Sequence, residues 1–191
     1  LTISLDAVCG EGTAQGSGTL RFGDEDWRGA FLITGSDCQV MNVPELAITA
    51  SPELELVLGS NGGRLTGSLM IPRALIKPEM MTGAKSESTD VVFVGEQGGS
   101  SRWPFNYELT IELGDDIAVD GYGLNANLAG GLSVSNKRTM VTGRGVLDVT
   151  QGTFTIFGKP LKIARGRLGF NGGPIDNPTL DVSARKVIGT N

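Results

Sequence analysis

The stretch Phe105-Asn106-Tyr107-Glu108-Leu109-Thr110-Ile111-Glu112-Leu113 decides the fold class of this chain. Apolar side chains occupy every second position, and polar side chains occupy each position between them. A period of two is typical of a half-buried β-strand and not of a helix. At about 3.4 Å per residue, such a segment extends to roughly 30 Å. The sequence therefore predicts a long strand with one apolar and one polar face.

The same alternation recurs on both sides of this stretch. A second long example carries Leu124, Leu128 and Leu132 on its apolar side, and Gly130-Gly131 is predicted to bend or bulge it. Together with shorter copies elsewhere, the pattern predicts about ten to thirteen strands and no helix of ten or more residues. The fold class is therefore all-β, with long antiparallel or mixed strands.

Turn and breaker residues punctuate these strands. Ser60-Asn61-Gly62-Gly63 and Gly114-Asp115-Asp116 have the composition of turns. The segment from Ile71 to Pro78 carries a proline near each end, which predicts an edge strand or an extended crossing because proline donates no hydrogen bond to a ladder. No sharp change of composition divides the chain, so residues 1–191 are expected to form a single β-rich domain.

Composition excludes several classes of function. The chain has 191 residues and no histidine, which excludes Ser-His-Asp and Cys-His catalysis and the usual zinc sites. The formal net charge of −5 opposes binding to nucleic acid. No uncharged apolar stretch is long enough for a helix to cross a bilayer, and the first residues do not form a signal peptide. The chain is therefore expected to be a fragment of a longer protein whose anchor lies outside it.

The two cysteines leave two readings open. Cys9 and Cys38 either close a disulfide in an oxidising compartment or are small buried thiols.

Apparent catalytic motifs have simpler explanations. The segment Gly152 to Pro160 resembles a phosphate-binding loop, but its glycines are one residue too far apart and Pro160 replaces the magnesium-binding hydroxyl. Asp24-Glu25-Asp26 fits a solvated turn better than a calcium site. We therefore expect no catalytic residue, cofactor or metal, and the chain is not expected to be an enzyme.

The C-terminal two thirds of the chain resembles a known family, the TamB C-terminal domain. The resemblance covers residues 67–185 and depends on the order and spacing of several short motifs. These are Leu113-Gly114-Asp115-Asp116-Ile117, the stretch from Gly121 to Gly130, Gly145-Val146-Leu147-Asp148-Val149, Gly152-Thr153-Phe154, Phe157-Gly158-Lys159-Pro160-Leu161, Arg165-Gly166, Phe170, Asp176-Asn177-Pro178 and Ala184-Arg185. Residues 1–66 match the family less clearly.

The resemblance implies a fold, a location and a partner. The implied fold is a β-taco, a curved half-pipe of β-sheet with a hydrophobic concave interior. The implied location is the periplasm of a Gram-negative bacterium, in a protein anchored in the inner membrane and related to the AsmA-like bridge proteins that carry phospholipid. The implied partner is TamA, an outer-membrane barrel protein, and the implied process is outer-membrane biogenesis and protein secretion.

Three functions compete for this architecture. The first is a lipid conduit, in which phospholipid acyl chains lie in a hydrophobic groove. The second is a chaperone-like module that captures unfolded outer-membrane protein strands by β-augmentation and docks TamA. The third is a spacer that docks a partner barrel and holds nothing.

Residues predicted to line the groove share the apolar side of the alternating segments. They are Phe105, Tyr107, Leu109, Ile111, Leu113, Leu124, Leu128, Leu132, Val134, Phe154, Ile156, Leu161, Ile163, Phe170, Leu180 and Val182.

Overall fold

The computed structural model describes residues 1–24, 26–78, 103–137 and 140–186. All the elements of regular structure in this part of the chain are strands. Their bounds are β1 Thr2–Cys9, β2 Gly12–Phe22, β3 Trp27–Ser36, β4 Cys38–Val43, β5 Leu46–Gly59, β6 Gly62–Ile76, β7 Phe105–Gly121, β8 Leu124–Lys137, β9 Met140–Ile156, β10 Lys159–Pro174 and β11 Thr179–Lys186. The predicted all-β fold is confirmed.

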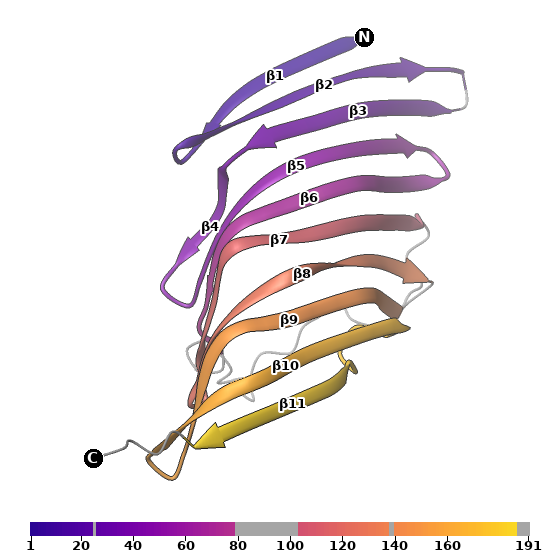
Figure 1. Cartoon of the computed structure of the whole chain (residues 1–191). Coiled ribbons are helices and arrows are strands. Elements are labelled where there is room, and N and C mark those ends of the chain that lie inside the picture. The colour runs from indigo at the N-terminus through magenta and orange to yellow at the C-terminus, as the bar shows by residue number, and fades with distance from the viewer. Residues whose placement is uncertain (25, 79–102, 138–139, 187–191) are drawn as a thin grey trace, which may run out of the picture.

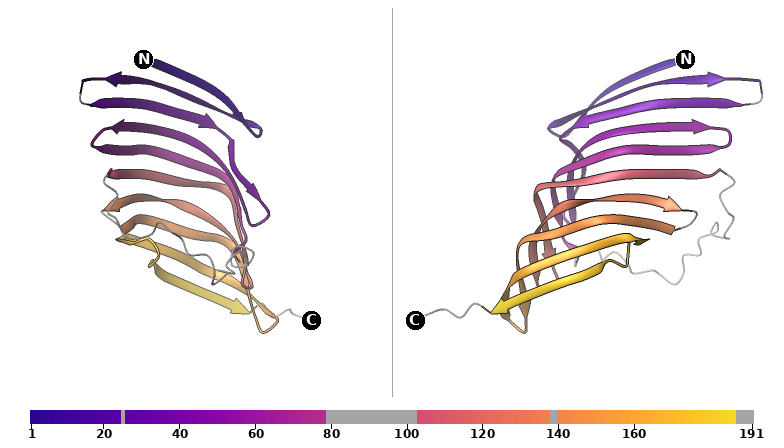
Figure 2. Two further views of the ribbon diagram at one scale, coloured as in Figure 1. Left: turned by 180° about the vertical axis from the view of Figure 1, so that it is seen from behind. Right: turned by 45° about the vertical axis from the view of Figure 1, so that its right-hand side comes forward.

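The strands form one open, curled sheet (Figure 1). Its order is β1-β2-β3-β5-β6-β7-β8-β9-β10-β11, and β4 pairs with the N-terminal part of β5. Neighbouring strands are antiparallel except β6 and β7, which are parallel. Short turns join several antiparallel pairs, such as the predicted one at Ser60 and Asn61 between β5 and β6. Turned views in Figure 2 show the same curl from other directions.

A row of irregular pairings crosses the sheet from β4 to β11. The pairing register shifts along this row in every adjacent pair except β9–β10, whose shift lies at Asn171/Pro174 and whose pairing is interrupted between Lys162 and Arg167. The shifts lie at Gln39/Met41, Thr49/Ser51, Ile71/Arg73, Leu113/Ala118, Asn127/Leu128 and Ile163/Arg165. A β-bulge bends the strand that carries it. The aligned shifts, which we call the bulge row, therefore account for the sharp bend shared by the long strands in Figure 1.

Two sequence predictions fail at the bulge row. Pro72 lies in β6, in the interior of the sheet and not at its edge. It is tolerated there because residues 71 and 72 have no partner in β5, so the missing N–H leaves no gap in that ladder. Asp115 and Asp116 do not form a turn but lie within β7, where they belong to the irregular stretch between Leu113 and Ala118. Bulges and turns use similar residues, and only the pairing distinguishes them.

A disulfide ties the N-terminal hairpin to the bend. Cys9 ends β1 and Cys38 begins β4, and they are bonded with their Cα atoms 4.9 Å apart. The backbone is packed tightly there, because a Cβ atom on Gly12 would lie 2.3 Å from the carbonyl carbon of Asp37. Asp37 itself has a φ of 50°, which produces the break between β3 and β4.

Removing this disulfide should destabilise the N-terminal part of the sheet. The bond joins residues 29 positions apart, and the chain-entropy model predicts a stabilisation of about 3 to 4 kcal/mol for a loop of that length. We expect the double variant Cys9→Ser/Cys38→Ser to lose about that much free energy of unfolding in a urea titration. A wild-type titration under reducing conditions serves as the matched control. Unchanged unfolding in both experiments would contradict the prediction.

Candidate functional site: the apolar face

Strand register places the predicted lining residues on one face of the sheet. Directly paired residues of neighbouring strands share a face. Ile111, for example, pairs with Leu69 on β6 and with Leu132 on β8. Followed from β7 to β11 in this way, all the predicted lining residues fall on this face, which we call the apolar face.

The apolar face also extends across the N-terminal strands, where the sequence analysis named no lining residue. Leu56, for example, pairs with Phe31 on β3 and with Leu65 on β6. The additional large side chains on this face include Ile3, Leu5, Leu20, Phe31, Ile33, Leu54, Leu56, Leu58, Leu65 and Leu69. No register-paired residue on this face between β1 and β9 is charged, among the residues that the structure describes.

Glycines interrupt the apolar alternation in these strands, so the sequence alone does not show that the apolar face is continuous. Gly18 and Gly29 occupy apolar-face positions, and a Cβ atom at either would lie within 2.6 Å of the ring of Phe31. Gly63 has the same relation to the ring of Phe105. An aromatic ring thus covers the backbone of each glycine, so the face stays apolar where the alternation in the sequence is interrupted.

Burial shows that the apolar face is the inner side of the curl. Ala50, Ala74, Ile117 and Ala126 all lie on this face beside the bulge row, and none is more than 5% exposed. No second layer of described strands packs on the sheet, so these side chains are covered because the sheet bends over them. Away from the bend the face is half-buried, and at the C-terminal edge Leu180 is 64% exposed.

The arrangement differs from a closed core. Only six hydrophobic side chains are buried among the described residues, and a domain of this size with a filled sandwich would bury many more. The remaining apolar side chains form a strip that water reaches. An exposed apolar surface that crosses a whole sheet is typical of a binding site.

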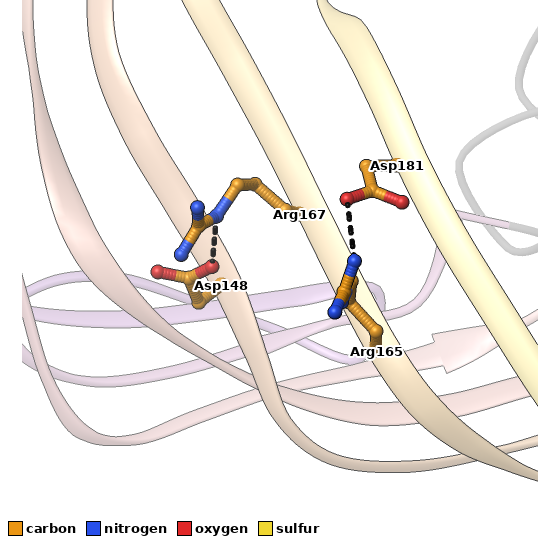
Figure 3. A network of polar contacts seen from close by, with 4 residues as sticks. All are labelled: Asp148, Arg165, Arg167 and Asp181. Carbon is orange, nitrogen blue, oxygen red and sulfur yellow. Dashed lines mark hydrogen bonds and ion pairs between the residues drawn. The ribbon is translucent and has the colours of Figure 1, made fainter.

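The opposite face is polar and carries the ion pairs. Arg167 donates a hydrogen bond to Asp148 at 2.7 Å, and Arg165 donates one to Asp181 at 3.4 Å (Figure 3). The hydrogen bond to Asp148, with the attraction of its charge, raises the pKa of Arg167. A third exposed pair, Arg73 and Asp116, lies at the bulge row. Such pairs add little stability and mark the solvated side.

Other classes of site are not visible in the described residues. They contain no group of three or more side chains placed to hold a metal ion. None of their segments forms a helix that is long and apolar enough to span a bilayer. Gly152–Ile156 continues β9 and is followed by a turn, so the segment that resembles a phosphate-binding loop is a strand and a turn.

Comparison with known proteins places the chain in a family. The family model of the TamB C-terminal domain matches residues 4–191. The translocation and assembly module subunit TamB of Haemophilus influenzae is 27% identical over 160 residues, which cover 75% of this chain and 12% of that protein. The resemblance seen in residues 67–185 is thereby confirmed, and it extends through the N-terminal strands that the sequence motifs left unassigned. This chain belongs to the TamB C-terminal domain family.

Proposed function

We propose that this domain binds phospholipid through the acyl chains and conducts it along the apolar face, between the inner and outer membranes of a Gram-negative envelope. One observation supports the proposal above the others: an apolar face without a charged register-paired residue continues from β1 to β9 in a sheet that has no second layer among its described elements. Acyl chains complement such a surface because each buried CH₂ group contributes about 0.8 kcal/mol.

The curl gives the two parts of a phospholipid different surroundings. Acyl chains would lie beside the bulge row, where the sheet shields Ala50, Ala74 and Ala126 from water. Head groups would remain at the open side of the sheet, where water solvates them. Each CH₂ group contributes the same small amount on an open face, so a few carbons more or less change binding little and specificity for chain length should be broad.

The wider setting of the domain is part of the same proposal. The domain would lie in the periplasm as a non-enzymatic part of a protein anchored in the inner membrane, and it would support outer-membrane protein assembly with a TamA-like barrel as partner. The curated relative is named as a subunit of a translocation and assembly module, which fits a partner of this kind. The chain corresponds to 12% of that relative, so a conduit between membranes would need further segments of the protein.

Native mass spectrometry with lipid extraction tests the proposal. The chain is purified without detergent from cells that contain phospholipid, and its fold is checked by circular dichroism. We expect phospholipid to co-purify, with acyl chains of mixed length. A folded domain that carries no lipid under these conditions, and takes none from phospholipid vesicles, would refute lipid binding.

An open strand edge favours a second candidate function. Among the described strands, β10 alone pairs with β11, and all residues of β11 are exposed. Such an edge can accept an additional strand, so the domain could capture unfolded outer-membrane protein strands by β-augmentation.

Proline substitution tests strand capture at β11. N–H groups of successive residues in an edge strand point alternately toward the neighbour and toward solvent. Proline placed separately at Val182 and at Ser183 therefore forms a matched pair, of which one removes an outward donor. We expect that variant alone to lose at least tenfold in affinity for an outer-membrane strand peptide while β10–β11 pairing survives. Equal binding by both variants and the wild type would exclude capture at this edge.

A further inference from the structure

The polar face contains a hollow that the apolar face does not explain. It has a volume of about 480 Å³, within the range of small-molecule sites. It crosses β6, β7, β8 and β9 close to the strand ends opposite the bulge row. Register places Thr66, Glu108, Ser135 and Thr142 in one line across its floor.

Internal hydrogen bonds fix one wall of the hollow. The hydroxyl of Thr142 donates to the carbonyl oxygen of Ser135 at 3.1 Å, and the two hydroxyl oxygens are also 3.1 Å apart. The side-chain amide of Asn136 accepts a hydrogen bond from the N–H of Tyr107 at 2.6 Å and donates one to the carbonyl oxygen of Phe105 at 2.7 Å. These groups have their partners within the sheet, so the wall is in place before any ligand arrives.

Two guanidinium groups lie at opposite ends of the hollow without a protein partner. Neither Arg64 nor Arg144 forms an ion pair or hydrogen bond within the described part of the chain. The guanidinium of Arg144 lies against Gly172, where a Cβ atom would come within 3.2 Å of it. β6 and β9 are three strand spacings apart, or about 14 Å between backbones, and register places Arg144 level with Ser68, four residues along β6 from Arg64. One small anion is therefore too short to contact both arginines at once.

The groups between the two arginines indicate the chemistry of the central part of the ligand. The hydroxyls of Thr66 and Ser133 and the carboxylate of Glu108 line this part and form no hydrogen bond with other described residues. A carboxylate repels a phosphate but accepts a hydrogen bond from an alcohol. The hollow thus presents a positive charge at each end and a hydrogen-bond acceptor between them.

We propose that this hollow binds a short polyol that carries a phosphate at each end. Each phosphate pairs with one guanidinium, in the charge-assisted geometry that arginine favours, and a ligand hydroxyl donates to Glu108. The ligand is either a free bisphosphate or the head group of a lipid with two phosphates. The site lies on the face opposite the acyl-binding surface and does not depend on lipid transport.

Calorimetry with a soluble probe tests the site in the absence of lipid. We expect the chain to bind glycerol 1,3-bisphosphate at low salt, and to bind glycerol 1-phosphate at least fivefold more weakly because only one arginine is engaged. Arg64→Gln and Arg144→Gln should each weaken bisphosphate binding at least fivefold. Arg165→Gln is the matched control, since it removes the same charge from the same face and should change binding less than twofold.

Vesicles distinguish the two sources of the ligand. Flotation compares cardiolipin vesicles, whose head group joins two phosphates through glycerol, with phosphatidylglycerol vesicles of equal total charge. Preference for cardiolipin that is lost in both arginine variants supports a lipid head group. Binding of the soluble bisphosphate alone, with the same variant pattern, supports a free ligand. Equal affinity for the mono- and bisphosphate, equal binding by Arg64→Gln and wild type, or no binding to either probe would overturn the proposal.

The outcome is separable from the test of acyl binding. An arginine on the apolar face, as in Ile156→Arg, should remove co-purifying lipid and leave bisphosphate binding within twofold of wild type. Loss of bisphosphate binding in that variant would overturn a site independent of the apolar face.

Discussion

Arginine placed at Leu128 or Ile156 should reduce co-purifying phospholipid at least tenfold while the domain stays folded. Both side chains lie on the apolar face, Leu128 beside the bulge row and Ile156 at the end of β9. A guanidinium there would displace several CH₂ groups of a bound chain, at about 0.8 kcal/mol each. The fold should survive, because an open face lets the long side chain carry its charge to water. Lipid extraction and mass spectrometry measure the loss.

Thr155→Arg provides the matched control. Thr155 neighbours Ile156 on the same strand but lies on the polar face, and it is exposed. The control should retain lipid at the wild-type level. If Leu128→Arg unfolds the domain while Ile156→Arg keeps its lipid, the apolar face is a closed core and the proposed conduit is wrong.

Truncation of Ile117 should produce the largest loss of stability of any single apolar substitution. Ile117 is 1% exposed and is the largest fully buried side chain among the described residues. It pairs with Ala74 at the bulge row, where the sheet bends most sharply. Ile117→Ala leaves a cavity at that bend and should lower the free energy of unfolding by about 2 to 5 kcal/mol. Urea denaturation followed by circular dichroism measures the change.

Ile111→Ala separates packing at the bend from packing elsewhere on the same strand. Ile111 lies on the same face of β7 but is only half-buried. We expect it to lose less than half as much free energy as Ile117→Ala, because water already reaches part of the side chain. Equal losses would mean that the flat part of the sheet is covered as well as the bend.

The sequence predicted the C-terminal strands better than the bend. Alternation in β7 and β8 is regular, so the period of two identified both their strand character and the residues that share a face. Asp115 and Pro72 were misread because a bulge needs the same turn-forming residues as a chain reversal, and local sequence does not specify which strand pairs where. Ile117 was missed for the same reason, since its burial results from a bend shared by several strands.

The N-terminal half of the apolar face was hidden by small residues. Gly16 and Gly18 occupy lining positions in β2, where the alternation should show large side chains. Their role depends on Phe31, which comes from the next strand and covers Gly18. The alternation along one strand contains no information about a side chain that comes from the next strand.

The number of strands in the sheet sets the distance over which a bound lipid could move across the domain. A ligand that follows the bulge row moves across the strands, and ten strands in line from β1 to β11 span about 43 Å at roughly 4.8 Å per step. One leaflet of a bilayer offers only about 15 Å of hydrocarbon depth. Several lipids could therefore bind one after another along the bulge row. The number of lipids bound per domain should then rise in whole-number steps with lipid supply.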